Sequence, residues 1–235
     1  MSFMSPALKK VLLMPLASEF LNASATFGSR TLYTYNAAQH PLGDGVYKEG
    51  YDTMDQTKTS KNILTVGAVN DAVSGSTRNP SLGTISNFSS TGPTDDGRIK
   101  PDVVGNGVNL YSAISSSDTA YANFSGTSMS GPNVAGSAML LVDYYGKRFP
   151  GQYMRASTLK SLIIHTADDI GNPGPDYFYG WGLMDTKEAA DQIKRHADKE
   201  SYRGILEDRL TTAVPSKIHT FTWNGTDPIR VTLGW

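Results

Sequence analysis

The sequence of 235 residues contains no cysteine, which excludes a disulfide framework and a thiolate metal site. It has no apolar run close to the roughly 18 residues of a membrane-spanning helix, so no membrane span is expected. It also has no excess of one charge, because 21 basic residues face 22 acidic ones for a net charge of −1. This balance gives no reason to expect nucleic acid or an anionic membrane as a partner. The 39% of hydrophobic and 18% of charged residues that are present are typical of a globular protein.

Strand and helix patterns alternate along the middle of the chain. The apolar run NILTVGAV at residues 62–69 is rich in β-branched residues and predicts a buried strand of a parallel sheet. A second strand is predicted within GVNLYSAI, at residues 107–114. Helices are predicted from about residue 128 to 146, from 157 to 167, and from Asp185 onward. This alternation indicates an α/β fold with a parallel sheet.

The first of these helices follows Ser128 and is rich in apolar residues. They occupy two adjacent faces and leave little polar surface, which predicts a buried helix in which Gly131 and Gly136 permit close approach of another backbone. Ser128 lies at the helix N-terminus, where free N–H groups and the helix dipole favour an anion such as the oxyanion of acyl transfer. The competing interpretation, which helix physics alone favours, is that Thr127 or Ser128 only caps the helix.

The stretch SGTSMSGPNVAG, residues 125–136, resembles the nucleophile motif G-T-S-M-A-x-P-x-V-A-G of the subtilisin-like serine proteases. Ser130 replaces the usual alanine, and Asn133 stands where histidine is common. The segments NILTVGAV, NFSSTGP, GRIKPDVV and YGWGLMD are similar to other family landmarks and follow in the family's order. Gly105-Asn106-Gly107 departs from the Ala-Pro-Gly that is usual after K-P-D-V-x. The likeness covers about residues 62–235 and is closest to members with a C-terminal β-barrel.

The resemblance implies a serine endopeptidase that hydrolyses polypeptide substrates and requires no cofactor. Ser128 would be the nucleophile, with Gly126 and Thr127 in the nucleophile loop and the Ser128 N–H helping to hold the oxyanion. It also implies a secreted or extracytoplasmic parent protein.

The aspartate and histidine that such an enzyme needs have no match in this sequence. The family places them in D-T/S-G and H-G-T-H contexts, and none of the four histidines has such a context: His40, His165, His196 and His219. Asn36 is the nearest candidate for the oxyanion asparagine, in a different context. We therefore expect the C-terminal part of a catalytic domain, whose missing N-terminal half is an expected partner. The alternative is a non-catalytic truncated subtilase, inactive by itself.

The expected organisation has three parts. Residues 1–42 are unassigned, because Lys9 and Lys10 precede a short apolar run as in a secretion signal but Pro15 interrupts it. Residues 43–197 form the C-terminal part of the catalytic domain, and residues 198–235 a linker and the first strands of a truncated β-module, where KIHTFTW and IRVTLGW predict a hairpin. The predicted fold is a partial subtilisin-like three-layer α/β fold with a parallel sheet, followed by the start of an all-β module.

Two further patterns compete for a chemical role. Ser157 and Lys160 match the S-x-x-K of serine–lysine enzymes, but the companion motifs S-D-N and K-T-G are absent, and Ser157 is a natural helix cap. The acidic pairs Asp95-Asp96 and Asp168-Asp169 would suit structural calcium or form solvated loops. No ligand spacing selects among these carboxylates, so no metal ligand is assigned.

Overall fold

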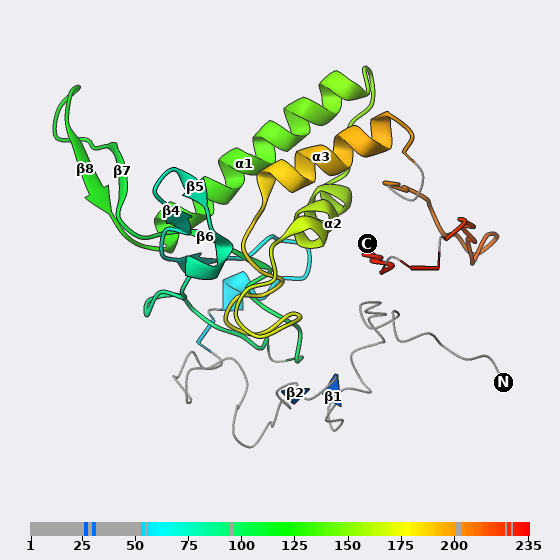
Figure 1. Ribbon diagram of the computed structural model, residues 1–235, viewed down its shortest axis with the longest axis horizontal. Coiled ribbons are helices and arrows are strands. Elements are labelled where there is room, and N and C mark those ends of the chain that lie inside the picture. Colours follow the sequence, from blue (N-terminus) through cyan, green and yellow to red (C-terminus); the bar gives the residue numbers. More distant parts are fainter. Residues whose placement is uncertain are drawn as a thin grey trace.

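The computed structural model describes residues 53–54, 56–94, 96–200, 204–223, 225–226 and 228–235, and the backbone of β1 (Thr26–Phe27) and β2 (Arg30–Thr31). Its centre is a parallel strand pair packed against three helices (Figure 1). The strands are β3 (Val66–Val69) and β6 (Val103–Asn106), and the helices are α1 (Thr127–Arg148), α2 (Ala156–Thr166) and α3 (Thr186–Ala197). This mixed architecture confirms the predicted α/β fold class.

Short strands and turns surround this centre. Val69 forms an antiparallel bridge with Ile85, and Val104 forms a parallel bridge with Leu183, so each central strand has a further neighbour. Among the described residues, three antiparallel pairs lie outside the sheet: β1 with β2, β4 (Val73–Ser74) with β5 (Thr77–Arg78), and β7 (Leu110–Ala113) with β8 (Tyr121–Phe124). The short 3-10 helices are η3 (Gln56–Lys58) and η4 (Pro80–Leu82). The strand predicted within 107–114 is thus present as β7, but it belongs to a separate hairpin.

One face of α1 packs closely on the central strands. Val134, Leu141 and Tyr145 are buried in the core cluster that also contains Val103. A Cβ added at Gly105 would lie 2.8 Å from Val134 Cγ2, and one added at Gly107 would lie 2.7 Å from Ala68 Cβ. Gly105, within β6, therefore allows α1 to approach the strand, and Gly107, just after β6, allows close approach to β3, because a side chain at either position would clash.

The other face of α1 departs from the prediction. Met139, Leu140 and Val142 are exposed, and a Cβ added at Gly131 or Gly136 would meet nothing within 4 Å. The prediction of a fully buried helix with close backbone approach at these glycines is therefore wrong for the part of the chain described above. The reason is geometric, since the central strands, α2 and α3 pack on only one side of α1 (Figure 1).

The remaining helices complete the core. Leu162 and Ile163 of α2 and Ala189 and Ile193 of α3 are buried against α1. The predicted start of α3 is confirmed, because the carboxylate of Asp185 caps the helix by accepting a 2.8 Å hydrogen bond from the Glu188 N–H. No described helix is both long and apolar enough to cross a membrane.

The C-terminal hairpin is not formed. The described residues of 204–235 contain no β-strand, and Ile218 and Leu233 are exposed. Instead the last residues lie on α2, where Arg230 Nη1 donates to the His165 carbonyl at 2.6 Å and Thr232 Oγ1 lies 2.9 Å from His165 Nδ1. A lone two-stranded hairpin is marginally stable in water, so contacts with the helix replace the strand ladder here.

Candidate active site

Ser128 is the second residue of α1 and is exposed to solvent. Gly126 occupies the N-cap position, and no side chain donates or accepts a capping hydrogen bond there. The interpretation that Thr127 or Ser128 caps the helix is therefore wrong. Within the described part of the chain the Ser128 hydroxyl has no hydrogen-bond partner, so it is free to meet a substrate.

The loop before Ser128 is fixed to the end of β6. The Gly126 N–H donates to the Gly107 carbonyl at 2.8 Å, and the Asn109 N–H donates to Ser125 Oγ at 2.8 Å. Ser130 is fully buried, and its hydroxyl donates to the Thr127 carbonyl at 3.3 Å. The hydroxyl of Ser130, which replaces the usual alanine of the motif, thus has a hydrogen-bond acceptor. Together these contacts hold the first turn of α1 against the end of β6.

The first turn also offers hydrogen-bond donors. The N–H groups of Met129 and Ser130 both donate to the Gly126 carbonyl, at 2.9 and 3.3 Å. The N–H groups of Thr127 and Ser128 precede them and have no acceptor within the helix, as is general for the start of an α-helix. These donors and the positive end of the helix dipole create an environment that stabilises negative charge beside the serine hydroxyl.

No described histidine is hydrogen-bonded to Ser128. His165 contacts Thr232. On α3, His196 packs against Phe149 with ring centroids 5.3 Å apart and planes inclined by 40°, and its Nδ1 accepts a 3.3 Å hydrogen bond from the Ile205 N–H. Burial lowers the pKa of His196.

One histidine does have a carboxylate partner, which the sequence did not reveal. His219 Nε2 lies 3.1 Å from Asp208 Oδ2, and both residues belong to the C-terminal segment after α3. The other candidates, His40 and Asn36, lie outside the described residues. The described chain thus presents the nucleophile without a bonded base.

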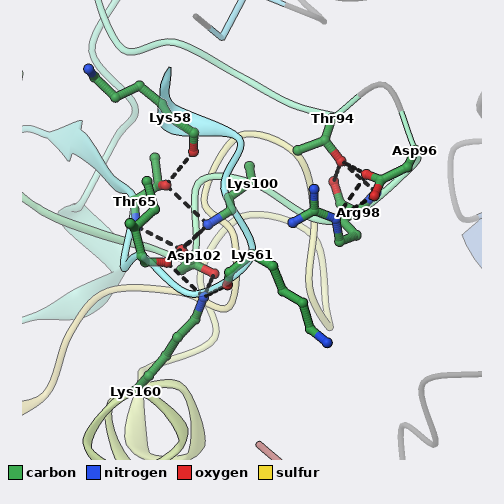
Figure 2. Close-up of polar contacts among 10 residues, drawn as sticks. Lys58, Lys61, Thr65, Thr94, Asp96, Arg98, Lys100, Asp102 and Lys160 are labelled. Atoms are coloured by element: carbon green, nitrogen blue, oxygen red, sulfur yellow. Dashed lines mark hydrogen bonds and ion pairs between the residues drawn. The ribbon is translucent and has the colours of Figure 1, made fainter. Parts of the chain in front are cut away.

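A buried ionic cluster holds the residues before β3 against the start of β6 (Figure 2). Asp102 receives Lys100 Nζ at 2.5 Å and the Thr65 N–H at 2.7 Å on one oxygen. Its other oxygen lies 2.9 Å from Lys160 Nζ. Burial lowers the pKa of Lys100, and the hydrogen bond from Lys100 to Asp102 opposes this shift. The cluster joins α2, β6 and the approach to β3, and sequence analysis did not predict it.

The same cluster excludes Lys160 as the base of a serine–lysine enzyme. Besides Asp102, Lys160 Nζ donates to the carbonyls of Lys61 and Ile63 at 2.9 and 2.8 Å, so its three protons are all engaged. An ammonium held in this way has no lone pair to accept a proton from Ser157. The prediction that Ser157 caps its helix is also wrong, because Arg155 is the N-cap of α2 and no side chain caps it.

The acidic pairs considered for calcium already have partners. Asp96 receives the Arg98 guanidinium at 2.7 Å and the Thr94 hydroxyl at 2.5 Å, and Asp168 forms an ion pair with Arg78. Asp95 lies outside the described residues. Among the residues that the structure describes, no three histidine, aspartate or glutamate side chains gather into a group suited to a metal ion.

Comparison with known proteins identifies the family. Residues 42–182, more than half of the chain, match the model described as the subtilase family. This chain belongs to the subtilase family. The family assignment confirms the resemblance carried by the motif around Ser128. The family match begins at residue 42. The resemblance seen in the sequence motifs begins twenty residues later, at about residue 62.

Named relatives of this subtilase cover only part of it. A C5a peptidase of Streptococcus pyogenes is 30% identical over 156 residues, which are 63% of this chain and 12% of the peptidase. An extracellular serine protease of Serratia marcescens is 40% identical over 80 residues, which are 34% of this chain and 7% of that protease. The chain therefore spans about a tenth of the length of these relatives.

A solved structure supports the fold. The CspB protease of Clostridium perfringens superposes with a TM-score of 0.52 at 24% identity, covering 61% of this chain and 29% of that one. The subtilisin-like arrangement of sheet and helices is thus present in this subtilase.

Proposed function

We propose that this chain supplies the nucleophile of a subtilisin-like serine endopeptidase and that Ser128 attacks the scissile carbonyl of a polypeptide substrate. The observation that carries the proposal is the position of Ser128, exposed on the first turn of α1 without a capping role, inside the region that matches the subtilase family. A serine at this place combines an accessible hydroxyl with helix N–H donors.

The chemistry follows from that position. The Ser128 hydroxyl adds to the carbonyl carbon, and the oxyanion that forms is stabilised by the Ser128 N–H in the loop containing Gly126 and Thr127. A histidine takes the hydroxyl proton and returns it to the leaving amine, while an aspartate orients that histidine. No described residue fills either role, so we infer that both come from the N-terminal half of a subtilase catalytic domain.

The open face of α1 supports this inferred partner. Met139, Leu140 and Val142 lie exposed beside glycines with open space around them. These three residues do not line the nearby groove of about 680 Å³ between α1, α2 and the residues leading into β3, but Thr127, next to the nucleophile, does. A large exposed apolar surface of this kind is typical of an interaction site. We infer that the companion half packs here and brings the base to Ser128.

A second function, a non-catalytic subtilase chain, is favoured by one observation. Each described histidine makes a polar contact with a residue other than Ser128, and none is hydrogen-bonded to Ser128. In this case the chain alone has no peptidase activity. The proposed chemistry needs no cofactor, and calcium would have only a structural role. By analogy with the extracellular relative, we infer that the parent protein acts outside the cytoplasm.

The experiment is to produce this chain together with an N-terminal subtilase half that carries the D-T-G and H-G-T-H motifs. Cleavage of an unstructured protein substrate is then measured for the native chain, Ser128→Ala and the matched control Ser157→Ala. We expect Ser128→Ala to lower kcat by about 10⁶-fold, the scale seen when subtilisin loses its serine, and Ser157→Ala to change little. Loss of activity in Ser157→Ala but not in Ser128→Ala would show that the nucleophile is assigned wrongly.

A further inference from the structure

The hairpin formed by β7 and β8 projects from the body near the start of α1 (Figure 1). Its base is fixed by the two hydrogen bonds that hold the nucleophile loop, at Asn109 and Gly126. Its tip is closed by the Ile114 N–H, which donates to the Ala120 carbonyl at 3.0 Å. The hairpin is therefore an ordered platform built directly onto the loop that carries Ser128.

Two tyrosines form an exposed aromatic surface on one face of this platform. Tyr111 pairs with Asn123 across the ladder, and Tyr121 lies two residues before Asn123, so the two tyrosines are diagonal neighbours on the same face. Their rings stack with centroids 5.4 Å apart and planes inclined by 22°. Tyr111 is 71% exposed and Tyr121 is 55% exposed. Stacking holds the rings in place and leaves their outer surfaces in water, as in aromatic binding surfaces.

The position of the pair points to the substrate as its occupant. Tyr121 precedes Ser128 by seven residues, so the two lie no more than about 25 Å apart even if the chain between them were fully extended. A polypeptide whose scissile bond reaches Ser128 can span that distance with about seven further residues. A long unstructured chain can therefore contact the tyrosines while its scissile bond lies at Ser128.

The charge of the hairpin indicates which substrate side chains would bind to it. Asp118 near the tip is its one charged residue between positions 109 and 125. Stacked tyrosines on a hairpin whose one charged side chain is a carboxylate favour arginine or lysine side chains flanked by apolar residues, because cations are attracted to ring faces. We propose that Tyr111 and Tyr121 bind a cationic, partly apolar stretch of the polypeptide substrate, several residues from the scissile bond. This inference rests on the proposed function, since it deepens the substrate class of the same site.

The test measures binding of a fluorescein-labelled, unstructured 20-residue Gly/Ser peptide with a central Arg-Leu-Arg to the purified full chain, by fluorescence anisotropy. We expect Tyr111→Ser/Tyr121→Ser to raise Kd about tenfold. Tyr111→Phe/Tyr121→Phe keeps the rings and should keep binding. The matched control Ser112→Ala/Ala122→Ser changes the opposite face of the hairpin and should leave Kd unchanged.

Three outcomes would overturn the inference. Equal Kd for the native and Tyr→Ser chains would show that the rings do not bind the peptide. Equal Kd for the Arg-Leu-Arg peptide and an all-Gly/Ser peptide would show that cationic and apolar side chains are not what the tyrosines bind. Loss of self-association in the Tyr→Ser variant, measured by sedimentation without a change in peptide Kd, would assign the surface to a second copy of the chain.

The result is separable from the test of the proposed function. Ser128→Ala should bind the Arg-Leu-Arg peptide with unchanged Kd although it cannot cleave. In the enzyme assembled with its companion half, Tyr111→Ser/Tyr121→Ser should lower kcat/KM about tenfold for a 20-residue substrate and leave it unchanged for a tetrapeptide. Full activity in that enzyme with no tyrosine effect would refute this inference alone, whereas tyrosine-dependent binding without activity would refute only the proposed function.

Discussion

The two faces of α1 differ in what they contact, although both are apolar. Leu141 is 1% exposed and packs in the core with the helices and β6, whereas its neighbour Leu140 is 66% exposed. The difference shows that apolar patterning alone does not tell which side of a helix has a partner within the same chain. It also shows that the chain builds a firm support under Ser128 while leaving open the side where we infer that a companion half packs.

The largest effect is expected at the buried ionic cluster of Lys100, Asp102 and Lys160. Asp102→Ala would leave Lys100 buried without its counter-charge, which should lower the free energy of unfolding by about 3–5 kcal/mol. The control Asp191→Ala breaks the exposed pair with Lys187 and should change stability little, because surface pairs contribute little. Urea unfolding followed by circular dichroism measures both. Similar small losses in the two variants would show that the cluster does not anchor β6.

The adjacent leucines test the comparison itself. Leu141→Ala should lower the free energy of unfolding by about 2–5 kcal/mol, because it opens a cavity in the core. Leu140→Ala should change it by no more than about 0.5 kcal/mol in the isolated chain. Equal losses, measured by urea titration, would mean that the open face of α1 is covered in solution. Addition of the companion half should make Leu140→Ala costly as well.

A smaller, pH-dependent effect is expected at His196, next to the C-terminal end of the packed face. Burial lowers its pKa in the folded chain, so the unfolded chain binds the proton more readily. The stabilisation is therefore complete above the ordinary histidine pKa of about 6.5 and decreases as the pH falls through the lower folded pKa. Protonation would also remove the acceptor for the Ile205 N–H.

The measurement compares unfolding free energies at pH 7.5 and 5.5 for the native chain and His196→Asn. The native chain should lose more stability between the two pH values than the variant does. An equal loss in both would show that another group is responsible.

Much of the fold could be predicted from local sequence. The apolar run at 62–69 contains β3, and the three helices begin within about a residue of their predicted starts, because periodicity and capping are local properties. The failures involve distant contacts. No local pattern shows that Lys160 and Lys100 share Asp102, that β8 pairs with β7, or that the final residues pack on α2 instead of forming a hairpin.

The candidate site was predicted in part for the same reason. The motif located Ser128 and its loop, which are contiguous in sequence, and the structure places that serine exposed at the helix start. Helix physics alone favoured a capping role and was wrong, because glycine takes the N-cap position. The base and its carboxylate cannot be predicted from a local motif in this chain, since a triad is assembled from distant segments.

The central claim is that Ser128 is a nucleophile whose base comes from a companion half. The most direct test is reaction with a fluorophosphonate probe, followed by intact mass and peptide mapping, for the chain alone and with a subtilase half that carries D-T-G and H-G-T-H. A serine hydroxyl is a weak nucleophile without an adjacent base, so we expect no labelling of the chain alone and stoichiometric labelling of Ser128 in the assembled protein. Stoichiometric labelling of the chain alone, or labelling of a different serine in the assembly, would contradict the claim.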